Sequence, residues 1–359
     1  MDIQIAKQEL IESKRPIYFF DDDPDGLSSF LQFYKFKKEG KGLVIKSSPE
    51  LRYSFLRKVE EYSADRVFIL DKPMVSKQFI DECPVKIIWI DHHEPTNITK
   101  ENLIYLNPRV KDHSINKPVS EISYEIFKEN LWIAMMGAVG DWTLPKFSKE
   151  FSEKYPDLLA PDITDPAKAL FSTELGNLIK IISFVLKGKS QDVNRAIKVL
   201  IKIDSPYEIL HQTTSKGKLI YRHYSKLNEE YSEHIENAKK QVKNPLKEAG
   251  DEHFLFYFYD GAKTSFTKEI SNELLFLHPE KLILVGRKAN GFVKMSVRSS
   301  VAILPLILEK TLKNFSGSSS GGHEHACGAH IKEQDLSKFI KELKKNYIDS
   351  LKKPIIDSL

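Results

Sequence analysis

The feature that most constrains the fold is a series of short, largely apolar runs in the first half of the chain, separated by stretches with helical spacing. The runs lie at 17–20 (IYFF), 43–46 (LVIK), 67–70 (VFIL) and 86–90 (KIIWI). Runs of this kind suit strands that are buried on both faces of a parallel sheet, with helices as the crossovers. We therefore predict a doubly wound α/β domain at the N-terminal end.

A chain of 359 residues is long enough for two domains, and its pattern changes twice more. Helical spacing begins at 121–136 and continues from 167 to 246. Its polar last part, 220–249, predicts a long exposed helix that ends at a boundary near Gly250. Strand patterns then return, and a closing amphipathic helix is expected. The C-terminal strands are predicted at 254–259, 282–286 and 291–298, and the helix at 335–351.

Composition excludes some classes of protein. The chain has no run of 18 apolar residues and no apolar signal-peptide core near its start, so we expect a cytoplasmic protein without a membrane span. Its two cysteines, Cys83 and Cys327, are far apart, which argues against a disulfide framework or a thiolate zinc site. The net charge of +4 is compatible with a polyanionic ligand, but many proteins without one share it.

Acidic residues and histidines follow three of the predicted strands, and one more acid follows the helical run LWIAMMGAVG. Because ligands of an open parallel sheet gather beyond the carboxyl ends of its strands, we expect these side chains to meet at one edge. In chain order they are Asp21, Asp23, Asp25, Asp71, Asp91, His92, His93 and Asp141.

Single acids have ordinary explanations. An Asp after a strand often forms a turn or caps a helix, and Asp22 or Ser28 could cap a helix at 27–38 in this way. Taken alone, Asp71 or Asp141 is explained more simply by such a role than by catalysis. One acid therefore does not predict a site.

The alternating carboxylates Asp21, Asp23 and Asp25 are harder to explain without a ligand. They repel one another, and proteins keep such clusters mostly where a cation neutralises them. Carboxylates with an imidazole, as at His92 and His93, suit Mn²⁺ or Mg²⁺ better than structural zinc. With several carboxylates to share, two ions bridged by one Asp could clamp the attacking and leaving oxygens of a phosphoryl transfer.

A glycine tract at 318–330 (SSSGGHEHACGAH) is the second candidate site. Glycine richness alone predicts only a flexible loop, but consecutive glycines also let backbone N–H groups approach an anion. We expect Ala326 and Gly328 to open a closely packed helix, and an arginine at the end of a predicted strand to contact phosphate in bidentate fashion. The residues predicted to bind the substrate's phosphate or terminal nucleotide are Arg298, Gly321, Gly322 and His323.

In this order, the segments resemble the motifs of the DHH phosphoesterase superfamily, in the branch with a C-terminal DHHA1 domain. RecJ-like exonucleases and oligonucleotide phosphodiesterases belong to that branch. The first motif, often HxDxDGxxS, matches 21–29; the second and fourth fall on Asp71 and Asp141. The naming motif matches 91–93, and the DHHA1 glycine-histidine motif matches 321–323. The resemblance covers nearly the whole chain.

The resemblance implies a role for each residue. Asp23 and Asp71 would hold one ion, and Asp71 would bridge to a second. His93 would contact the scissile phosphate, and Asp91 would orient its neighbours. The second ion's ligands would be Asp25, Asp71, His92 and Asp141.

The chain departs from the family pattern at two points. Many members have a metal-binding His at the start of the first motif, where this chain has Phe19 and Asp21. Asp21 is therefore expected to substitute as an oxygen ligand, or the first ion to bind more weakly. The DHHA1 glycine run is also a Ser followed by two glycines rather than three glycines.

The resemblance also implies the architecture and the activity. Residues 1–190 would form a DHH metal-binding catalytic domain, 191–249 a helical connector, and 250–359 a DHHA1 substrate-binding domain of α/β class. The activity would be Mn²⁺- or Mg²⁺-dependent hydrolysis of single-stranded DNA or RNA from an end, as in RecJ-like exonucleases, with two ions.

Two alternatives stay open. One is a phosphodiesterase of small substrates such as nano-RNA, 3′-phosphoadenosine 5′-phosphate or cyclic dinucleotides. The other is an inactive replication-associated scaffold. A homodimer, or replication and repair partners, would fit any of these, and the residues do not fix the polarity of digestion.

Overall fold

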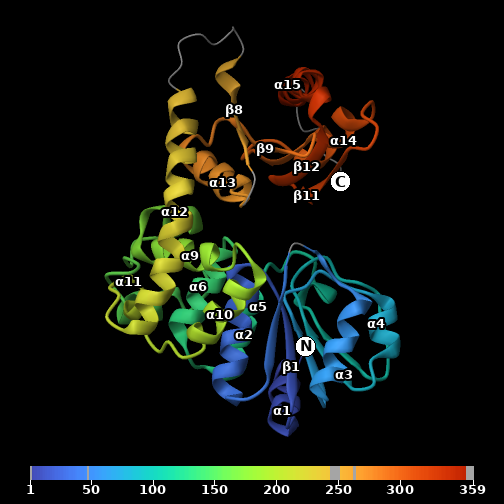
Figure 1. The fold of residues 1–359 in the computed structure, drawn as a ribbon, viewed down its shortest axis with the longest axis vertical. Coiled ribbons are helices and arrows are strands. Elements are labelled where there is room, and N and C mark those ends of the chain that lie inside the picture. The colour runs from blue at the N-terminus through green and yellow to red at the C-terminus, as the bar shows by residue number, and fades with distance from the viewer. Residues whose placement is uncertain (1, 47, 243–250, 262–263, 353–359) are drawn as a thin grey trace. The chain divides into compact units, whose positions relative to one another are not determined.

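A computed structural model describes residues 2–46, 48–242, 251–261 and 264–352. The chain divides into two compact units, unit 1 (Met1–Ser225) and unit 2 (Lys226–Leu359), shown as a ribbon in Figure 1. The division falls within helix α12 (Ser215–Val242), and the predicted boundary near Gly250 lies outside the described residues. The three-part division of the chain stays a prediction. In the part of the chain that the structure describes, no helix is long and apolar enough to span a membrane.

Unit 1 is built on a parallel five-stranded sheet with the order β2-β1-β4-β6-β7. The four predicted strands are confirmed. The fifth, β7, was missed because its LIYL sequence is short and mostly half-buried. The strands are β1 (Pro16–Asp21), β2 (Lys41–Ile45), β4 (Arg66–Leu70), β6 (Lys86–Ile90) and β7 (Leu103–Leu106), with β3 (Glu50–Leu51) and β5 (Met74–Val75) paired separately.

The strand order creates a switch point. After β1 the chain forms β2 on one side, whereas β4 pairs with β1 on the other side. A crevice at the carboxyl ends of the strands is expected at such a reversal, and it is where ligands of open α/β sheets bind. Phe20 is in register with Leu70, so Asp21 and Asp71 come from neighbouring strand ends.

Helices cover both faces of this sheet, because each strand sends apolar side chains both ways. Phe19 lies in one buried cluster, where it contacts Phe79 of α4 edge to face. Phe20 points to the other face and stacks on Phe30 of α2 with ring centroids 4.4 Å apart. The first face is covered by α3 (Leu56–Tyr62) and α4 (Lys77–Glu82). The second is covered by α2 (Pro24–Lys37), on which α5 (Val119–Phe127) and α6 (Leu131–Gly140) pack.

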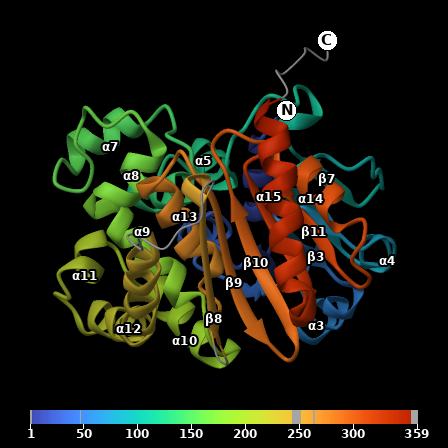
Figure 2. The same ribbon diagram turned by 90° about the horizontal axis from the view of Figure 1, so that it is seen from above.

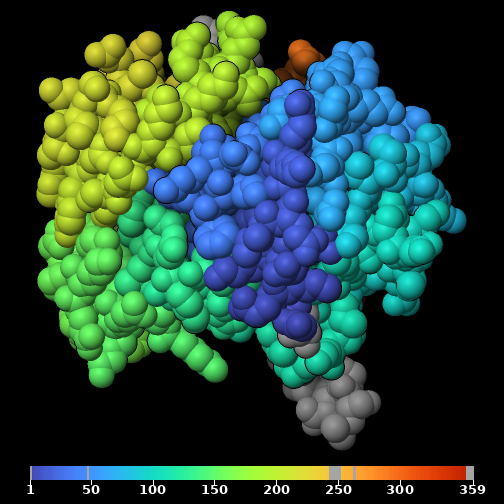
Figure 3. All heavy atoms as spheres, turned by 90° about the horizontal axis from the view of Figure 1, so that it is seen from below, coloured from blue at the N-terminus to red at the C-terminus, as the bar shows by residue number. Residues whose placement is uncertain are grey.

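Helix α1 (Gln4–Glu12) lies at the amino ends of the strands, away from the acidic edge. Its Glu9 pairs with Arg66 (Nε–Oε2 2.7 Å) and with Lys86, the residues that begin β4 and β6. In Figure 3 the N-terminal residues, dark blue, lie across this end of unit 1. The opposite, carboxyl edge is where the candidate site lies.

Two helix predictions were imprecise. Helix α2 begins at Pro24, not at residue 27, and its cap is Asp23, which accepts from Gly26 N at 3.1 Å. The single helix expected at 121–136 is two helices, α5 and α6, because Lys128 and Asn130 have positive φ angles of 56° and 57°.

The rest of unit 1 is helical up to α12, as the spacing predicts. Its helices are α7 (Ser148–Lys154), α8 (Pro166–Ser172), α9 (Glu174–Val185), α10 (Ser190–Leu200) and α11 (Pro206–Leu210).

Short 3₁₀ turns occur in both units. Unit 1 has η1 (Tyr53–Phe55) and η2 (Pro108–Val110), and unit 2 has η3 (Asp251–His253) and η4 (Glu333–Asp335).

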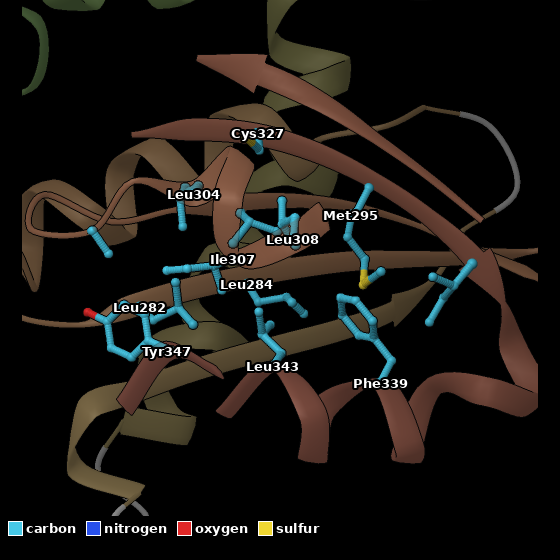
Figure 4. Close-up of a cluster of buried hydrophobic side chains, with 14 of the residues drawn as sticks. Leu282, Leu284, Met295, Leu304, Ile307, Leu308, Cys327, Phe339, Leu343 and Tyr347 are labelled. Atoms are coloured by element: carbon cyan, nitrogen blue, oxygen red, sulfur yellow. The ribbon is translucent and has the colours of Figure 1, made fainter. Parts of the chain in front are cut away.

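Unit 2 contains a mixed sheet with the order β11-β12-β10-β9-β8, in which β8 and β9 are parallel and the other described neighbours are antiparallel. Helix α15 lies along this sheet in Figure 2, and its apolar side packs with α14 on the core shown in Figure 4. The strands are β8 (Phe254–Asp260), β9 (Leu282–Ala289), β10 (Phe292–Arg298), β11 (Ser319–His323) and β12 (Ala326–Lys332); the helices are α13 (Thr267–Leu277), α14 (Leu304–Leu312) and α15 (Leu336–Lys352).

The glycine tract is a β-hairpin formed by β11 and β12. The expectation that Ala326 and Gly328 open a helix was wrong, because both lie in β12 and pair across the sheet. The small side chains of Ala326 and Gly328 let neighbouring backbone approach closely, and a strand can use this property as well as a packed helix can.

Candidate metal centre

Asp71 is the central residue of the acidic edge. It follows β4 with φ +61°, an uncommon backbone conformation for a residue with a side chain, and is 1% exposed. Its Oδ1 lies 3.3 Å from His92 Nε2, which in turn lies 3.6 Å from Asp141 Oδ2. Three groups of ligand type, from three distant segments, therefore converge.

Two overlapping groups of side chains could hold cations, and Asp71 belongs to both. In each group one ligand atom per residue lies within 4.8 Å of the others. The groups are Asp71 with His92 and His93, and Asp71 with Asp21 and Asp23. The structure thus brings together the residues that follow β1, β4 and β6.

The concentration of negative charge shifts the ionisation of these groups. Burial, followed by the charges of Asp25, Asp23, Asp21 and Asp141, raises the pKa of Asp71 well above its ordinary value. Burial also raises the pKa of Asp25. Keeping Asp71 ionised at neutral pH therefore destabilises the folded protein, and a bound cation would offset that cost.

The donor set fits a divalent cation. Asp71 Oδ1 is buried and has no hydrogen-bond partner among the described residues. Buried polar atoms are normally paired, so an unpaired carboxylate oxygen 3.3 Å from His92 Nε2 indicates a ligand-binding position. Several carboxylates with one or two imidazoles are the donors that Mn²⁺ and Mg²⁺ accept.

Asp25 combines a place in the cluster with a structural role that the sequence did not reveal. Its Oδ2 accepts from Val119 N at 2.8 Å and its Oδ1 from Ser120 N at 2.9 Å, and Ser120 Oγ donates to it as well. It therefore holds the N-terminus of α5, where a negative charge is favourable. A carboxylate has about four acceptor positions, so a place for a cation remains.

Asp91 positions the loop that carries the two histidines. Its Oδ1 lies 2.8 Å from His93 Nδ1, and its Oδ2 accepts from His93 N at 3.2 Å. Asn107, which follows β7, donates to Asp91 Oδ2 at 3.3 Å and to His93 O at 2.9 Å. Burial lowers the pKa of His93, but the hydrogen bond and charge of Asp91 outweigh it, so the net pKa is raised.

Asp21 lies beside a buried cation of the protein itself. Lys72 Nζ is 2.7 Å from Asp21 Oδ1, and its side chain is 0% exposed. Burial and the charge of Asp23 nevertheless raise the pKa of Asp21 to about 6, against the opposing effect of Lys72. Asp21 thus belongs to the cluster and shares its Oδ1 with Lys72.

In unit 2, the residues predicted to bind substrate lie on β10 and β11, the two strands that flank β12. Ala326 pairs with Arg298 of β10 on one side and with His323 of β11 on the other. Arg298 Nε donates to Asn272 Oδ1 at 2.6 Å, and Nη1 donates to Val297 O and Cys327 O at 2.9 and 3.2 Å. These bonds leave Nη2 for the predicted phosphate contact.

Gly321 and Gly322 differ in how much space there is for a side chain. A Cβ at Gly321 would meet nothing within 4 Å, whereas at Gly322, with φ +146°, it would lie 2.3 Å from Ala326 O. Gly322 is therefore required by the hairpin. At Gly321, by contrast, the described chain leaves room for a side chain.

Sequence reasoning missed three functional neighbours, Lys72, Asn107 and Ser120. Asn107 follows a strand in the way that Asp71 and Asp91 do, so recognising β7 would have identified it. Lys72 stands directly after a predicted ligand, a visible signal that was not used. Ser120 had no local signal, because its contact with Asp25 joins segments 95 residues apart.

A parallel sheet with aspartates and histidines at its carboxyl edge defines an α/β protein with a candidate metal centre. The comparisons give the family. Residues 17–160 match the DHH family N-terminal domain and residues 251–348 match the DHHA1 domain. The chain therefore belongs to the DHH family, with a DHHA1 domain after the DHH domain. No curated protein sequence matches it.

Solved structures share the fold at low sequence identity. RecJ from Thermus thermophilus in complex with Mn²⁺ is 13% identical with a TM-score of 0.65, and the match covers 98% of this chain and 55% of that chain. This chain thus spans about half of that RecJ. An exonuclease RecJ bound to manganese is 12% identical (TM-score 0.63; coverage 99% and 95%). The pGpG-specific phosphodiesterase PggH from Vibrio cholerae is 14% identical (TM-score 0.50; coverage 94% and 100%).

Proposed function

We propose that this chain is a Mn²⁺- or Mg²⁺-dependent phosphodiesterase that hydrolyses single-stranded nucleic acid from an end. The observation that carries the proposal is the convergence of Asp71, His92 and Asp141, with His92 Nε2 at 3.3 and 3.6 Å from the two carboxylates. Carboxylates and a histidine at a sheet switch point suit a reaction in which bound cations neutralise the negative charge of a phosphodiester.

Asp71, His92, Asp141 and Asp25 would hold one ion, and by resemblance Asp23 and Asp71 would hold a second. When bound, such ions stabilise charge on the phosphoryl oxygens and make water a better nucleophile near neutral pH. His93 would donate a hydrogen bond to a phosphate oxygen from Nε2, because Asp91 occupies Nδ1 at 2.8 Å. Asp91 would act by positioning that ring.

The end of the substrate would be bound by unit 2. Arg298 supplies a buried guanidinium whose Nη2 is not used in the hydrogen bonds described above. Gly321 and Gly322 expose their backbone in strand β11. His323 would add a donor beside them. Two matched structures are described as RecJ bound to Mn²⁺, which supports an exonuclease, and the match to PggH supports hydrolysis of small nucleotides as the second candidate.

One assay separates these candidates. Purified protein with Mn²⁺ is incubated with 5′- and 3′-labelled single strands, with dinucleotides and with cyclic dinucleotides, beside the Asp141→Ala variant. We expect stepwise shortening from one end and a loss of roughly 10²-fold or more in the variant, since Asp141 contributes directly to the ligand set. Cleavage of dinucleotides alone would select the second candidate. Equal turnover by the variant would contradict the proposal.

The glycine tract provides a prediction of its own. Gly321→Ala should leave the fold intact, because nothing lies within 4 Å of the added Cβ, but should raise KM about tenfold if phosphate approaches that backbone. Gly322→Ala is the matched control, since its Cβ would lie 2.3 Å from Ala326 O and should lower stability. Steady-state kinetics measure the change in KM, and thermal unfolding measures the change in stability. An unchanged KM in Gly321→Ala would remove the tract from the binding site.

A further inference from the structure

Lys72 is an unusual cation for its position. It follows Asp71 directly, is completely buried, and is among the largest fully buried side chains of the described chain. Its Nζ donates to Asp21 Oδ1 at 2.7 Å and to Ser48 O at 2.6 Å. Its backbone is held as well, because Trp89 Nε1 donates to Lys72 O at 2.9 Å. A buried ammonium is kept only where specific partners compensate for its desolvation.

The partner of Lys72 belongs to one of the two cation-binding groups. Asp21, Asp23 and Asp71 form that group, and Asp21 Oδ1 accepts from both Lys72 Nζ and Asp22 N. A divalent ion placed among these carboxylates would lie close to a positive charge that cannot move into solvent. The repulsion between two such cations in a buried setting is large.

The other group, Asp71 with His92 and His93, lies beside Asp141. His92 Nε2 is 3.3 Å from Asp71 Oδ1 and 3.6 Å from Asp141 Oδ2. The Lys72 ammonium contacts Asp21, which belongs to the first group and not to the second. The two halves of the cluster are therefore unequal in charge.

We propose that Lys72 replaces one of the two metal ions, so that the chain binds a single divalent cation tightly, among Asp71, His92 and Asp141, while the Lys72 ammonium neutralises Asp21. This inference rests on the proposed function, because it assumes that the cluster holds metal. In it, Lys72 supplies a fixed positive charge at the place where the family resemblance implies a second ion. Asp21 and Lys72 then form a permanent pair.

The number of bound ions tests the proposal directly. Wild-type protein is titrated with Mn²⁺ by calorimetry, and its metal content after desalting is measured by elemental analysis. Low-temperature electron paramagnetic resonance then distinguishes one isolated Mn²⁺ from an exchange-coupled pair. We expect one tightly bound ion per chain and the signal of an isolated ion.

Removal of the ammonium should restore the second site. Lys72→Met keeps the length and apolar part of the side chain but frees Asp21, so a second Mn²⁺ should bind roughly tenfold or more tightly than to the wild type. A coupled signal should appear. Lys86→Met is the matched control, since Lys86 pairs with Glu9 at the opposite end of the sheet, and it should bind one ion. Lys72→Gln, which can still donate to Asp21, tests the same point if Lys72→Met does not fold.

Each outcome is decisive. Two ions of similar affinity in the wild type would overturn the role of Lys72 and leave the proposed function standing. A single ion in folded Lys72→Met and Lys72→Gln would overturn it as well. A wild type that binds no Mn²⁺ would contradict the proposed function itself.

Discussion

Asp71→Asn should lower the rate of phosphodiester hydrolysis by about 10³-fold or more, because the amide keeps the shape of the side chain but removes the charge shared by both cation-binding groups. Single-turnover assays with Mn²⁺ measure this loss. The wild-type rate in a folded variant would contradict the assigned role.

The same variant should be at least as stable as the wild type without metal. Burial and four neighbouring carboxylates raise the pKa of Asp71, so its ionised form at neutral pH opposes folding, and the neutral amide relieves that repulsion. Added Mn²⁺ should then raise the melting temperature of the variant less than that of the wild type. Thermal unfolding with and without Mn²⁺ measures both effects.

Asp65→Asn is the control variant, and we expect it to be less stable than the wild type. Asp65 accepts from Ser13 Oγ, from Lys14 N at 2.6 Å and from Arg15 N at 3.0 Å, and these bonds outweigh partial burial and lower its pKa. Its replacement should reduce stability and leave catalysis unchanged. A loss of stability in both variants would show that the charge of Asp71 is structural.

Gly137→Ala should damage the fold and the site together. A Cβ at Gly137 would lie 2.5 Å from Ser120 Cβ and 2.6 Å from Ser28 Cβ, at the crossing of α6 with α5 and α2. Overpacking of this kind costs about 1–3 kcal/mol. It would also move Ser120 away from Asp25, and Asp141 with the end of α6, so activity should fall by up to about 10²-fold.

Denaturant unfolding and kcat measure these losses. Gly321→Ala is the comparison, because the same change there meets nothing within 4 Å and should not lower stability. If Gly137→Ala unfolded at the wild-type denaturant concentration, the three helices could not be packed as closely as described.

Much of unit 1 was predictable because its strands are apolar on both faces. Four buried runs predicted four strands, and the acids after them predicted where the site would lie. Asp21 and Asp71 stand at the carboxyl ends of β1 and β4, and the pairing of these two strands in the structure brings the two aspartates together.

What could not be predicted depends on contacts between distant segments or on backbone angles. The break between α5 and α6 arises from positive φ angles at Lys128 and Asn130, which helical spacing does not encode. The Ser120 contact with Asp25 requires the packing of α2 against α5. The strands of the glycine tract were missed because β11 is exposed throughout and so lacks an apolar pattern.

The central claim is that the carboxyl edge of the unit 1 sheet binds a divalent cation. Crystals of the protein grown with Mn²⁺, with diffraction recorded at the manganese absorption edge, test it most directly. We expect an anomalous peak within coordination distance of Asp71, His92 and Asp141. Mn²⁺ bound elsewhere, with no peak among these three residues, would contradict the claim.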